Sequence, residues 1–266
     1  MTPGAPEPPR ARIRVQVAPE LRFLLPAVHR HGDVSFGHDG TSSLGHVVEA
    51  LGVPLTEVGL LTVDGREVPP SHRPVDGEHA EVHPVHRPQH LPPEAPRPPR
   101  FLLDVHLGTL ARRLRLVGVD AAYRNDSDDD ALLRQANEEK RVLLTRDRGL
   151  LRRHALWAGA HVRGSSPDAQ AADVLDRFAP ALRPWSRCTA CNGLLAPVRK
   201  ADIADRLPPG TRRTYDTFRR CGTCGRLYWP GAHHARLRAR VEAALADAAR
   251  RRERANRGEP DGLGGA

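Results

Sequence analysis

The four cysteines of the chain form two pairs with the same internal spacing. Both pairs read Cys-x-x-Cys: Cys188 with Cys191, and Cys221 with Cys224. Such a pair places two thiolates at the tip of a tight turn, so two pairs can hold one zinc ion tetrahedrally. A redox pair or four unrelated buried thiols are the alternatives, but matched pairs in a reducing compartment favour metal. We therefore predict a structural Zn²⁺ whose closed coordination sphere supports folding rather than catalysis.

A second group of reactive residues consists of aspartates at the ends of predicted strands. Asp104 nearly completes the apolar run FLLDV, Asp147 follows LLT, and Asp126 and Asp129 stand where another strand leads into a helix. Ligands of open parallel sheets bind at the carboxyl ends of strands, where these carboxylates would converge. Their oxygens suit Mg²⁺ or Mn²⁺, ions that can activate water and neutralise charge during attack on a phosphodiester.

Each aspartate taken alone also has a simple structural interpretation. Asp128 or Asp129 could cap the helix that follows. Asp147 could pair with one of its arginine neighbours, Arg146 or Arg148. The joint placement of the aspartates favours a metal site over these separate explanations.

The charge balance suits a partner that carries phosphates. The chain has 41 Lys and Arg against 32 Asp and Glu, for a net charge of +9. Basicity alone does not identify the partner, because a GC-rich coding sequence also supplies arginines. Arg112 and Arg115 on a predicted helix, and Arg146 beside Asp147, are candidate contacts to a nucleic-acid backbone. A solvated basic helix face is the alternative for the first two.

The chain divides where proline is concentrated. Before the division, a strand at 13–17, a helix from Ser43, a hairpin around Asp64-Gly65 and a closing strand predict a small β-grasp domain at 11–85. Residues 86–99 form a Pro-rich linker. The N-terminal residues lack the apolar core of a signal peptide and no apolar run reaches the length of a membrane span, so we expect a cytoplasmic protein.

The pattern of apolar residues along the chain changes after the linker. Strands and helices alternate over 100–184, which predicts an α/β domain with a parallel sheet and helices on both faces. The cysteine pairs, short strands and the start of a helix occupy 185–240. The region 241–266 is expected to contain the end of that basic helix and a flexible tail, with fraying after about Arg250.

These residues also resemble a known family. FLLDVHLGTLARRLRLVGVDAAYRNDSDDDALLRQANEEKRVLLTRDRGLLRR is similar to the PIN-like ribonuclease domain of the Mut-seven C-terminal family, and RCTAC with RCGTCGRLYWPGAHHARL is similar to its zinc ribbon. LGVPLTEVGLLTVDGREV with VDGEHAEVHPV resembles the ubiquitin-like β-grasp domain of family members. The resemblance implies an α/β protein with a PIN-like parallel-sheet domain between an N-terminal β-grasp domain and a C-terminal zinc ribbon.

The same resemblance implies a metal-dependent ribonuclease in which Mg²⁺ or Mn²⁺ is held by Asp104, Asp129 and Asp147. Our leading hypothesis is an endonuclease, although the sequence does not distinguish it from an exonuclease. Asp126 or Asp168 would supply a fourth acid. The implied partner is RNA, such as tRNA or another structured RNA, and the β-grasp domain would dock a protein or position the RNA. A noncatalytic RNA-binding adaptor is the alternative. A sulfur-carrier role is disfavoured because the β-grasp module ends VHPVHRP, far from Gly264-Gly265.

Overall fold

The computed structural model describes residues 11–232 and 234–257, and Gly264-Gly265 lie outside the described residues. Contacts within the chain define two compact units. The first unit runs to His86 and also includes Asp147–His154, whereas the second unit comprises the remainder from Arg87 onward. Each unit is described separately below.

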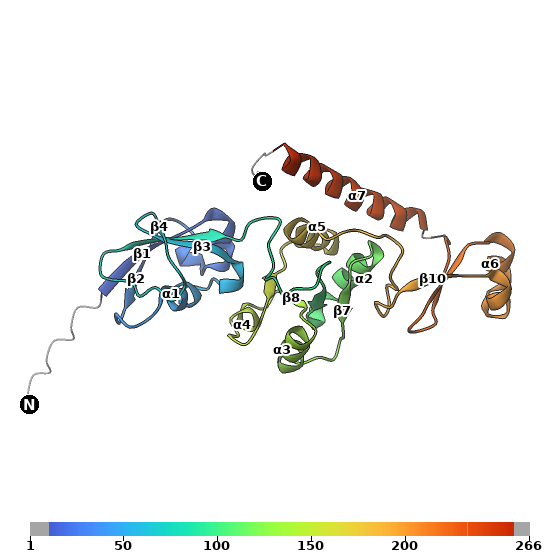
Figure 1. The fold of residues 1–266 in the computed structure, drawn as a ribbon, viewed down its shortest axis with the longest axis horizontal. Helices are drawn as coiled ribbons and strands as arrows, with labels where there is room; N and C mark the ends of the chain where they lie inside the picture. The colour runs from blue at the N-terminus through green and yellow to red at the C-terminus, as the bar shows by residue number, and fades with distance from the viewer. Residues whose placement is uncertain (1–10, 233, 258–266) are drawn as a thin grey trace, which may run out of the picture. The chain divides into compact units, whose positions relative to one another are not determined.

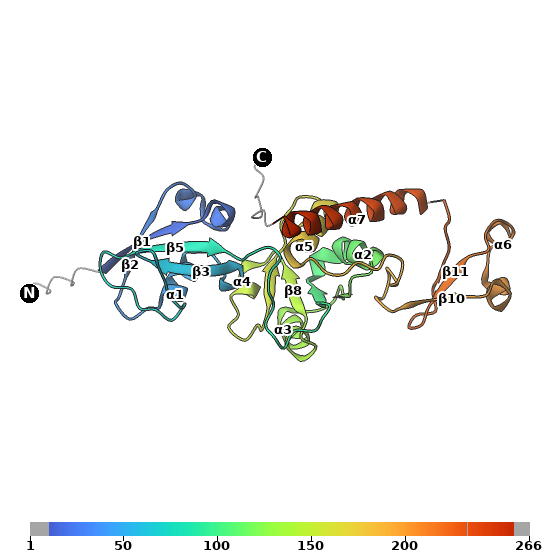
Figure 2. The ribbon, with the colours of Figure 1, turned by 45° about the horizontal axis from the view of Figure 1, so that its top comes forward.

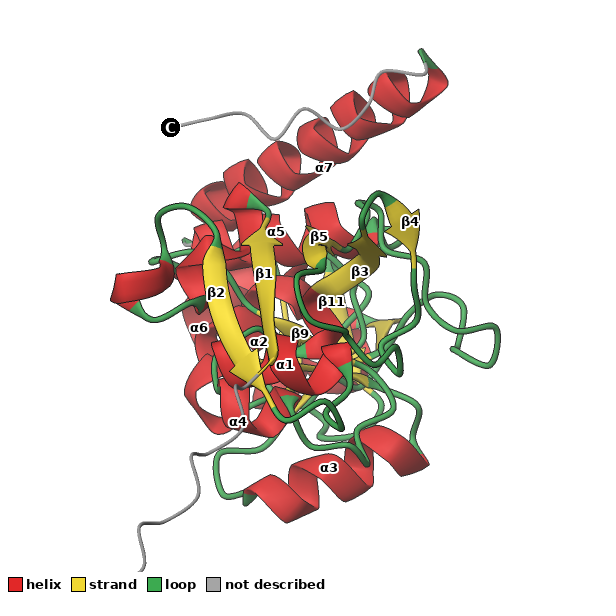
Figure 3. Cartoon of the chain, turned by 90° about the vertical axis from the view of Figure 1, so that its left-hand side faces the viewer, coloured by secondary structure: helices red, strands yellow, loops and turns green. Residues whose placement is uncertain are grey.

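The first unit contains a five-stranded sheet in the order β2-β1-β5-β3-β4, in which β1 is parallel to β5 and every other pair is antiparallel. Figure 3 shows β1 and β2 side by side. The strands are β1 (Ala11–Val17), β2 (Val34–His38), β3 (Val58–Val63), β4 (Arg66–Glu67) and β5 (His79–Pro84). The helices are α1 (Leu44–Leu51), α4 (Arg148–Leu151) and the 3-10 turns Pro19–Leu24, Ala27–His29 and Leu55–Glu57.

Local sequence explains much of this unit. Alternate residues of β1, including Ile13 and Val15, are fully buried, as the strand period requires. The β3–β4 turn has φ of 47° at Asp64 and 78° at Gly65, and two positive φ angles define the tight hairpin that Asp-Gly favours. Ser43 caps α1 by accepting from the N–H of His46.

The second unit is built on a four-stranded, fully parallel sheet in the order β7-β6-β8-β9. The helices α2 and α5 lie on one side of this sheet and α3 on the other (Figures 1 and 2). The elements are β6 (Phe101–Leu103), the 3-10 turn Val105–Leu107, α2 (Gly108–Leu116), β7 (Ala121–Tyr123), α3 (Asp129–Glu138), β8 (Val142–Thr145), β9 (Gly159–His161) and α5 (Pro167–Phe178). The short strands are apolar and buried because helices cover the sheet.

The cysteine-rich part of the second unit, called the ribbon below, contains a three-stranded antiparallel sheet in the order β10-β11-β12. Ile203, Leu207 and Phe218 form its small apolar core. Its elements are β10 (Leu195–Val198), the 3-10 turn Lys200–Arg206, α6 (Pro209–Thr214), β11 (Phe218–Cys221) and β12 (Leu227–Tyr228), followed by α7 (His234–Asn256).

Two features of the second unit refine the sequence-based description. The helix α7 continues to Asn256, so the expected fraying does not begin at about Arg250, and the rest of the expected flexible tail, 258–266, lies outside the described residues. The Pro-rich segment has no helix or strand, but it is attached to α5: Arg87 forms ion pairs with Asp173 at 2.8 Å and Asp176 at 2.9 Å. Among the described helices, none is long and apolar enough to span a membrane.

Candidate functional site

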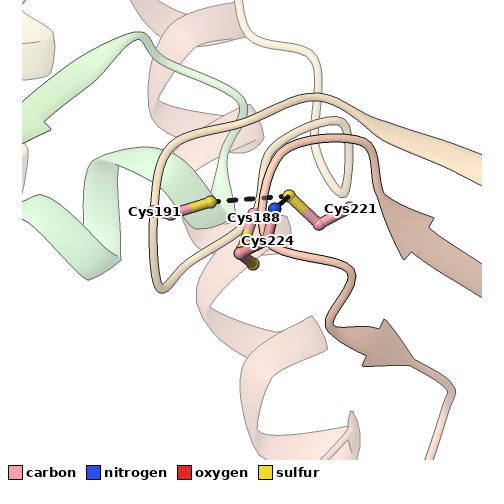
Figure 4. A group of neighbouring side chains, drawn as sticks. All are labelled: Cys188, Cys191, Cys221 and Cys224. Carbon is pink, nitrogen blue, oxygen red and sulfur yellow. Dashed lines mark hydrogen bonds between the residues drawn. The ribbon is translucent and has the colours of Figure 1, made fainter.

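The four cysteine side chains converge on one point (Figure 4). Their Sγ atoms all lie within 4.8 Å of one another. The Cys188–Cys224 Sγ distance is 3.7 Å and the Cys191–Cys221 distance is 3.4 Å. A tetrahedral zinc ion with Zn–S bonds of about 2.3 Å would separate its ligands by about 3.8 Å. The thiols are free and already spaced as the ligands of one such ion.

The two cysteine turns share one backbone geometry. In the first, the N–H of Asn192 donates to the carbonyl of Cys188 at 2.9 Å, and in the second the N–H of Gly225 donates to Cys221 at 3.0 Å. Asn192 and Gly225 occupy equivalent positions with φ of 71° and 70°. Glycine and asparagine are the residues that adopt this left-handed conformation most readily. In the first turn it is Asn192, and not the following Gly193, that has this conformation.

Gly193 is needed for a different reason, because it allows close packing at the cysteine cluster. A Cβ atom at this position would lie 2.4 Å from Thr223 Oγ1 and 2.9 Å from Cys221 Sγ. Distances below 3 Å require the neighbouring atoms to move. The two cysteine turns can therefore approach each other only with glycine here.

The thiols differ in their pKa values. Burial raises the pKa of Cys221, but the N–H groups of Cys224 and Thr223 outweigh it and leave the pKa at about 6. Burial and the neighbouring thiols raise the pKa of Cys191 to about 12. Four adjacent thiolates repel one another, so a cation is required for all of them to ionise together. This donor set matches zinc in type, number and spacing.

Polar side chains fix the first cysteine turn to the parallel-sheet domain. Arg115 is 2% exposed, and its guanidinium donates to the carbonyls of Ala121 (2.8 Å), Thr189 (3.2 Å) and Ala190 (2.8 Å). Asn192 Nδ2 donates to Asp120 at 2.8 Å, and Asn192 Oδ1 accepts from the N–H of Ala121 at 3.1 Å. The cysteine site and the sheet are thus parts of one hydrogen-bonded structure.

Asp120 is the charged centre of this connection. It pairs with Arg141 at 2.6 Å and with Arg187 at 3.0 Å. Burial raises its pKa, but hydrogen bonds from Arg141 and Asn192 outweigh burial and hold the pKa below its usual value. Asp120 is therefore an ionised structural group.

Asp104 lies at the carboxyl end of a strand of the parallel sheet, the edge at which open α/β sheets bind their ligands. It follows β6 directly, is 9% exposed, and accepts from the N–H of Val105 and from Thr145 Oγ1, both at 2.6 Å. Thr145 ends the neighbouring strand β8. After β6 the chain crosses to β7 on one side, and after β8 to β9 on the other, so the two strand ends define the switch point of the sheet.

The remaining sequence-predicted acids of the second unit are exposed around the start of α3. Asp128 is the N-cap and accepts from the N–H of Ala131 at 2.7 Å, which leaves Asp129 as the first helical residue. Asp126 forms an exposed ion pair with Arg124 at 3.1 Å. Its pKa is lowered by the hydrogen bond from that arginine.

Asp147 belongs to the first unit, two residues after Thr145 along the chain. It caps α4 by accepting from the N–H groups of Gly149 at 2.6 Å and Leu150 at 3.3 Å. Within the described residues, the cysteines form the one group of three or more metal-ligating side chains whose ligand atoms lie within 4.8 Å of one another.

Asp168 has a structural role. It pairs with Arg113 and Arg240 and so connects α5 with α2 and α7.

The candidate phosphate-binding arginines have different surroundings. Arg112 and Arg146 are exposed. Arg115 does not fit the prediction, because it is buried and three backbone carbonyls occupy its guanidinium. The sequence predicts that all three arginines lie on a phosphate-binding surface. It does not show that Arg115 is buried, because nothing in the sequence of a helix reveals which of its arginines a later segment will cover.

The sequence interpretation also overlooked residues that support the site. Thr145 is the polar end of an otherwise apolar strand, a signal that was available in LLTRD. Tyr228, whose hydroxyl lies 3.0 Å from Cys188 Sγ, and Asn192 had no comparable local signal.

Comparison with known families identifies this arrangement. A family model described as the Mut7-C RNAse domain matches residues 99–241, and one described as Mut7-C ubiquitin matches residues 10–90. The first match covers more than half of the chain, and the chain belongs to the Mut7-C RNAse domain family. The resemblance inferred from sequence and the mixed α/β fold with its N-terminal ubiquitin-like domain are confirmed. Searches of curated proteins and of solved structures returned no match.

Proposed function

We propose that this protein is a metal-dependent ribonuclease, an endonuclease that hydrolyses RNA phosphodiester bonds. The observation that carries the proposal is Asp104 at the switch point of the parallel sheet in a chain of the Mut7-C RNAse domain family. A carboxylate fixed at this edge lies where open α/β sheets bind their ligands.

Asp104 would be the central ligand of Mg²⁺ or Mn²⁺. Its two hydrogen bonds, to Val105 and Thr145, orient the carboxylate, and each oxygen retains a further lone pair for a cation. Asp129, Asp147 and Asp126 are the proposed additional acids. The bound ion would neutralise phosphate charge and activate the attacking water. The donor chemistry fits, because these ions prefer carboxylate oxygens.

Asp104→Asn is the sharpest test of the nuclease proposal. The amide keeps the size of the side chain, and its oxygen can still accept from the N–H of Val105 while its NH2 donates to Thr145 Oγ1, but it removes the negative charge. With Mn²⁺ and labelled structured RNA, the wild type should cleave internally, whereas Asp104→Asn and Asp147→Asn should bind RNA without cutting it. The matched control is Asp216→Asn, which removes a carboxylate that is 88% exposed on the ribbon.

The possible results separate the nuclease from its alternatives. Equal cleavage by the wild type and both site variants would identify a contaminant and refute the assignment. Binding without cleavage by any variant, including the wild type, would favour the noncatalytic RNA-binding adaptor.

The zinc proposal has an independent test. The four cysteines would hold one structural Zn²⁺, and the ribbon it orders would help to bind RNA. Metal analysis should return about one zinc per chain. Cys221→Ser should lose zinc together with ordered structure, because binding and folding of such sites are coupled. A folded wild-type protein without metal would contradict this proposal.

The proposed RNA surface includes the exposed Arg112 and Arg146 but not Arg115. Because arginines displace counterions from phosphates, RNA binding should weaken as salt rises. Transfer RNA or another structured RNA is the proposed substrate class. We also assign the ubiquitin-like domain a protein-docking role and the protein a cytoplasmic location, as part of the same proposal.

A further inference from the structure

A cavity of about 560 Å³ lies between the ribbon strands, the segment that leads into the ribbon, and the start of α7. Its volume falls within the range of about 300–1,000 Å³ typical of small-ligand sites. All of its walls belong to the second unit. The side chains that give it chemical character are Trp185, Arg187, Arg219, Tyr228, Trp229 and His234, and we call it the aromatic pocket.

Aromatic rings dominate the aromatic pocket. Trp185 and His234 are stacked, with ring centroids 5.1 Å apart and an interplanar angle of 27°. Trp185 has φ of 61°, a left-handed conformation that is strained for a bulky residue. The N–H of Trp185 donates to the carbonyl of Leu116 at 3.1 Å, which holds the segment in place. Strained conformations of this kind concentrate at binding sites.

The indole groups of the pocket retain free hydrogen-bonding capacity. Within the described residues, neither Trp185 nor Trp229 donates its indole N–H to an acceptor, whereas Trp157 outside the pocket donates to the carbonyl of Arg141 at 2.9 Å. Half-buried tryptophans usually find such a partner. Two donors beside a cavity can serve a polar, planar ligand.

The charge of the aromatic pocket selects the ligand class. Two of its described lining residues are arginines, Arg187 and Arg219, and none is acidic. Arg187 is already ion-paired with Asp120 at 3.0 Å, so the positive charge open to a ligand comes from Arg219 and from the start of α7. α7 begins at the pocket and adds the exposed Arg236 near its start, whereas the exposed Arg238 pairs with Glu242 at 3.0 Å. Aromatic faces beside arginines bind single-stranded nucleic acid, because bases stack on the rings while the cations meet the phosphates. A proline-rich peptide could also use aromatic rings, but it gains nothing from this positive charge.

We propose that the aromatic pocket binds an unpaired nucleobase of RNA, next to but separate from the cysteine site. The choice of RNA rests on the proposed function, whereas the binding itself requires no cleavage. Stacking in the aromatic pocket holds one single-stranded nucleotide while Arg219 and Arg236 contact the backbone. The ribbon and α7 therefore recognise an unpaired segment of the substrate.

The test uses the full-length, zinc-loaded protein without added Mg²⁺ or Mn²⁺, and a single-stranded RNA that contains one 2-aminopurine. Stacking on an aromatic ring quenches this fluorescent base, so quenching reports occupancy and anisotropy of a terminal label reports affinity. The variants Trp229→Leu and His234→Ala should each weaken binding by about 5- to 150-fold, the range expected for loss of one stacking contact. Both should also reduce the quenching.

Two controls separate stacking from general damage. His234→Phe keeps an aromatic face and should bind within about twofold of the wild type. Trp157→Leu removes a tryptophan outside the pocket and should leave quenching unchanged. Zinc content and circular dichroism establish that each variant is folded.

The outcomes are distinct from those of the nuclease test. Quenching by a wild type that never cleaves RNA would support the pocket while refuting the nuclease. Folded Trp229→Leu and His234→Ala variants with wild-type affinity would overturn the pocket even if cleavage is observed. Binding of a proline-rich peptide by a protein that does not bind the RNA would also overturn it, and would identify a peptide groove.

Discussion

Asn192→Ala tests how the first cysteine turn is attached to the parallel-sheet domain. The native asparagine has φ of 71° and makes two side-chain hydrogen bonds, one to the Asp120 carboxylate and one from the N–H of Ala121. Alanine cannot make either bond, and its Cβ disfavours the left-handed backbone. Asn192→Gly also removes both bonds but adopts that backbone freely.

The expected loss in the free energy of unfolding is the sum of these separate contributions. A neutral hydrogen bond contributes about 1 kcal/mol and one to a charged group about 1.5–3 kcal/mol, so both substitutions should lower the free energy of unfolding by about 3 kcal/mol. Alanine adds a left-handed cost of about 1–2 kcal/mol, and the greater unfolded-state freedom of glycine offsets part of the difference. We therefore expect Asn192→Ala to be about 1 kcal/mol less stable than Asn192→Gly.

Urea unfolding at a fixed free zinc concentration, followed by tryptophan fluorescence, measures this difference. All three tryptophans of the chain, Trp157, Trp185 and Trp229, lie in the second unit, so the signal reports on the unit that contains Asn192. The urea concentration at the unfolding midpoint should shift. The slope of the free energy of unfolding against urea concentration should not change, because the surface exposed on unfolding is the same.

Two results would refute the reasoning. If the alanine and glycine variants are equally stable, the left-handed backbone at Asn192 does not contribute. If both match the wild type within about 0.5 kcal/mol, the size of an ordinary surface substitution, the hydrogen bonds do not hold the cysteine turn to the sheet.

Three further predictions concern the same region. Tyr228→Phe removes the hydroxyl beside Cys188 Sγ and should weaken zinc binding by about 10-fold, measured by competition with a chelator. Asp120 has a lowered pKa in the folded protein, so its contribution to stability is present above its unfolded pKa of about 3.9 and disappears as pH falls through the folded value. The stability gap between wild type and Asp120→Asn, measured by urea unfolding, should therefore narrow below about pH 4; a constant gap would contradict this. Gly193→Ala would place its Cβ against Thr223 and should lower both zinc content and the thermal unfolding temperature, whereas unchanged values would show that the turns can separate without loss.

The local features of this protein were predictable because they depend on neighbouring residues. The spacing of Cys188 and Cys191 fixes the geometry of a turn, and Asp64-Gly65 selects a tight hairpin. Alternating apolar strands and amphipathic helices predicted the parallel sheet, since burial on both faces leaves a recognisable pattern. The position of Asp104 after an apolar strand followed from the same pattern.

The tertiary structure alone decided which polar groups meet across long separations in the chain. Asn192 bonds to the N–H of Ala121, 71 positions away, and Arg115 to the carbonyl of Ala190, 75 positions away. A basic residue on a helix shows no sign in sequence that another segment will cover it, so Arg115 was predicted on the surface. The partnership of Thr145 with Asp104 depends on the order of strands in the sheet, as the aromatic pocket depends on the packing of α7 beside the ribbon. Residue spacing thus predicted the cysteine cluster, whereas packing between distant segments determined which side chains hold it in place.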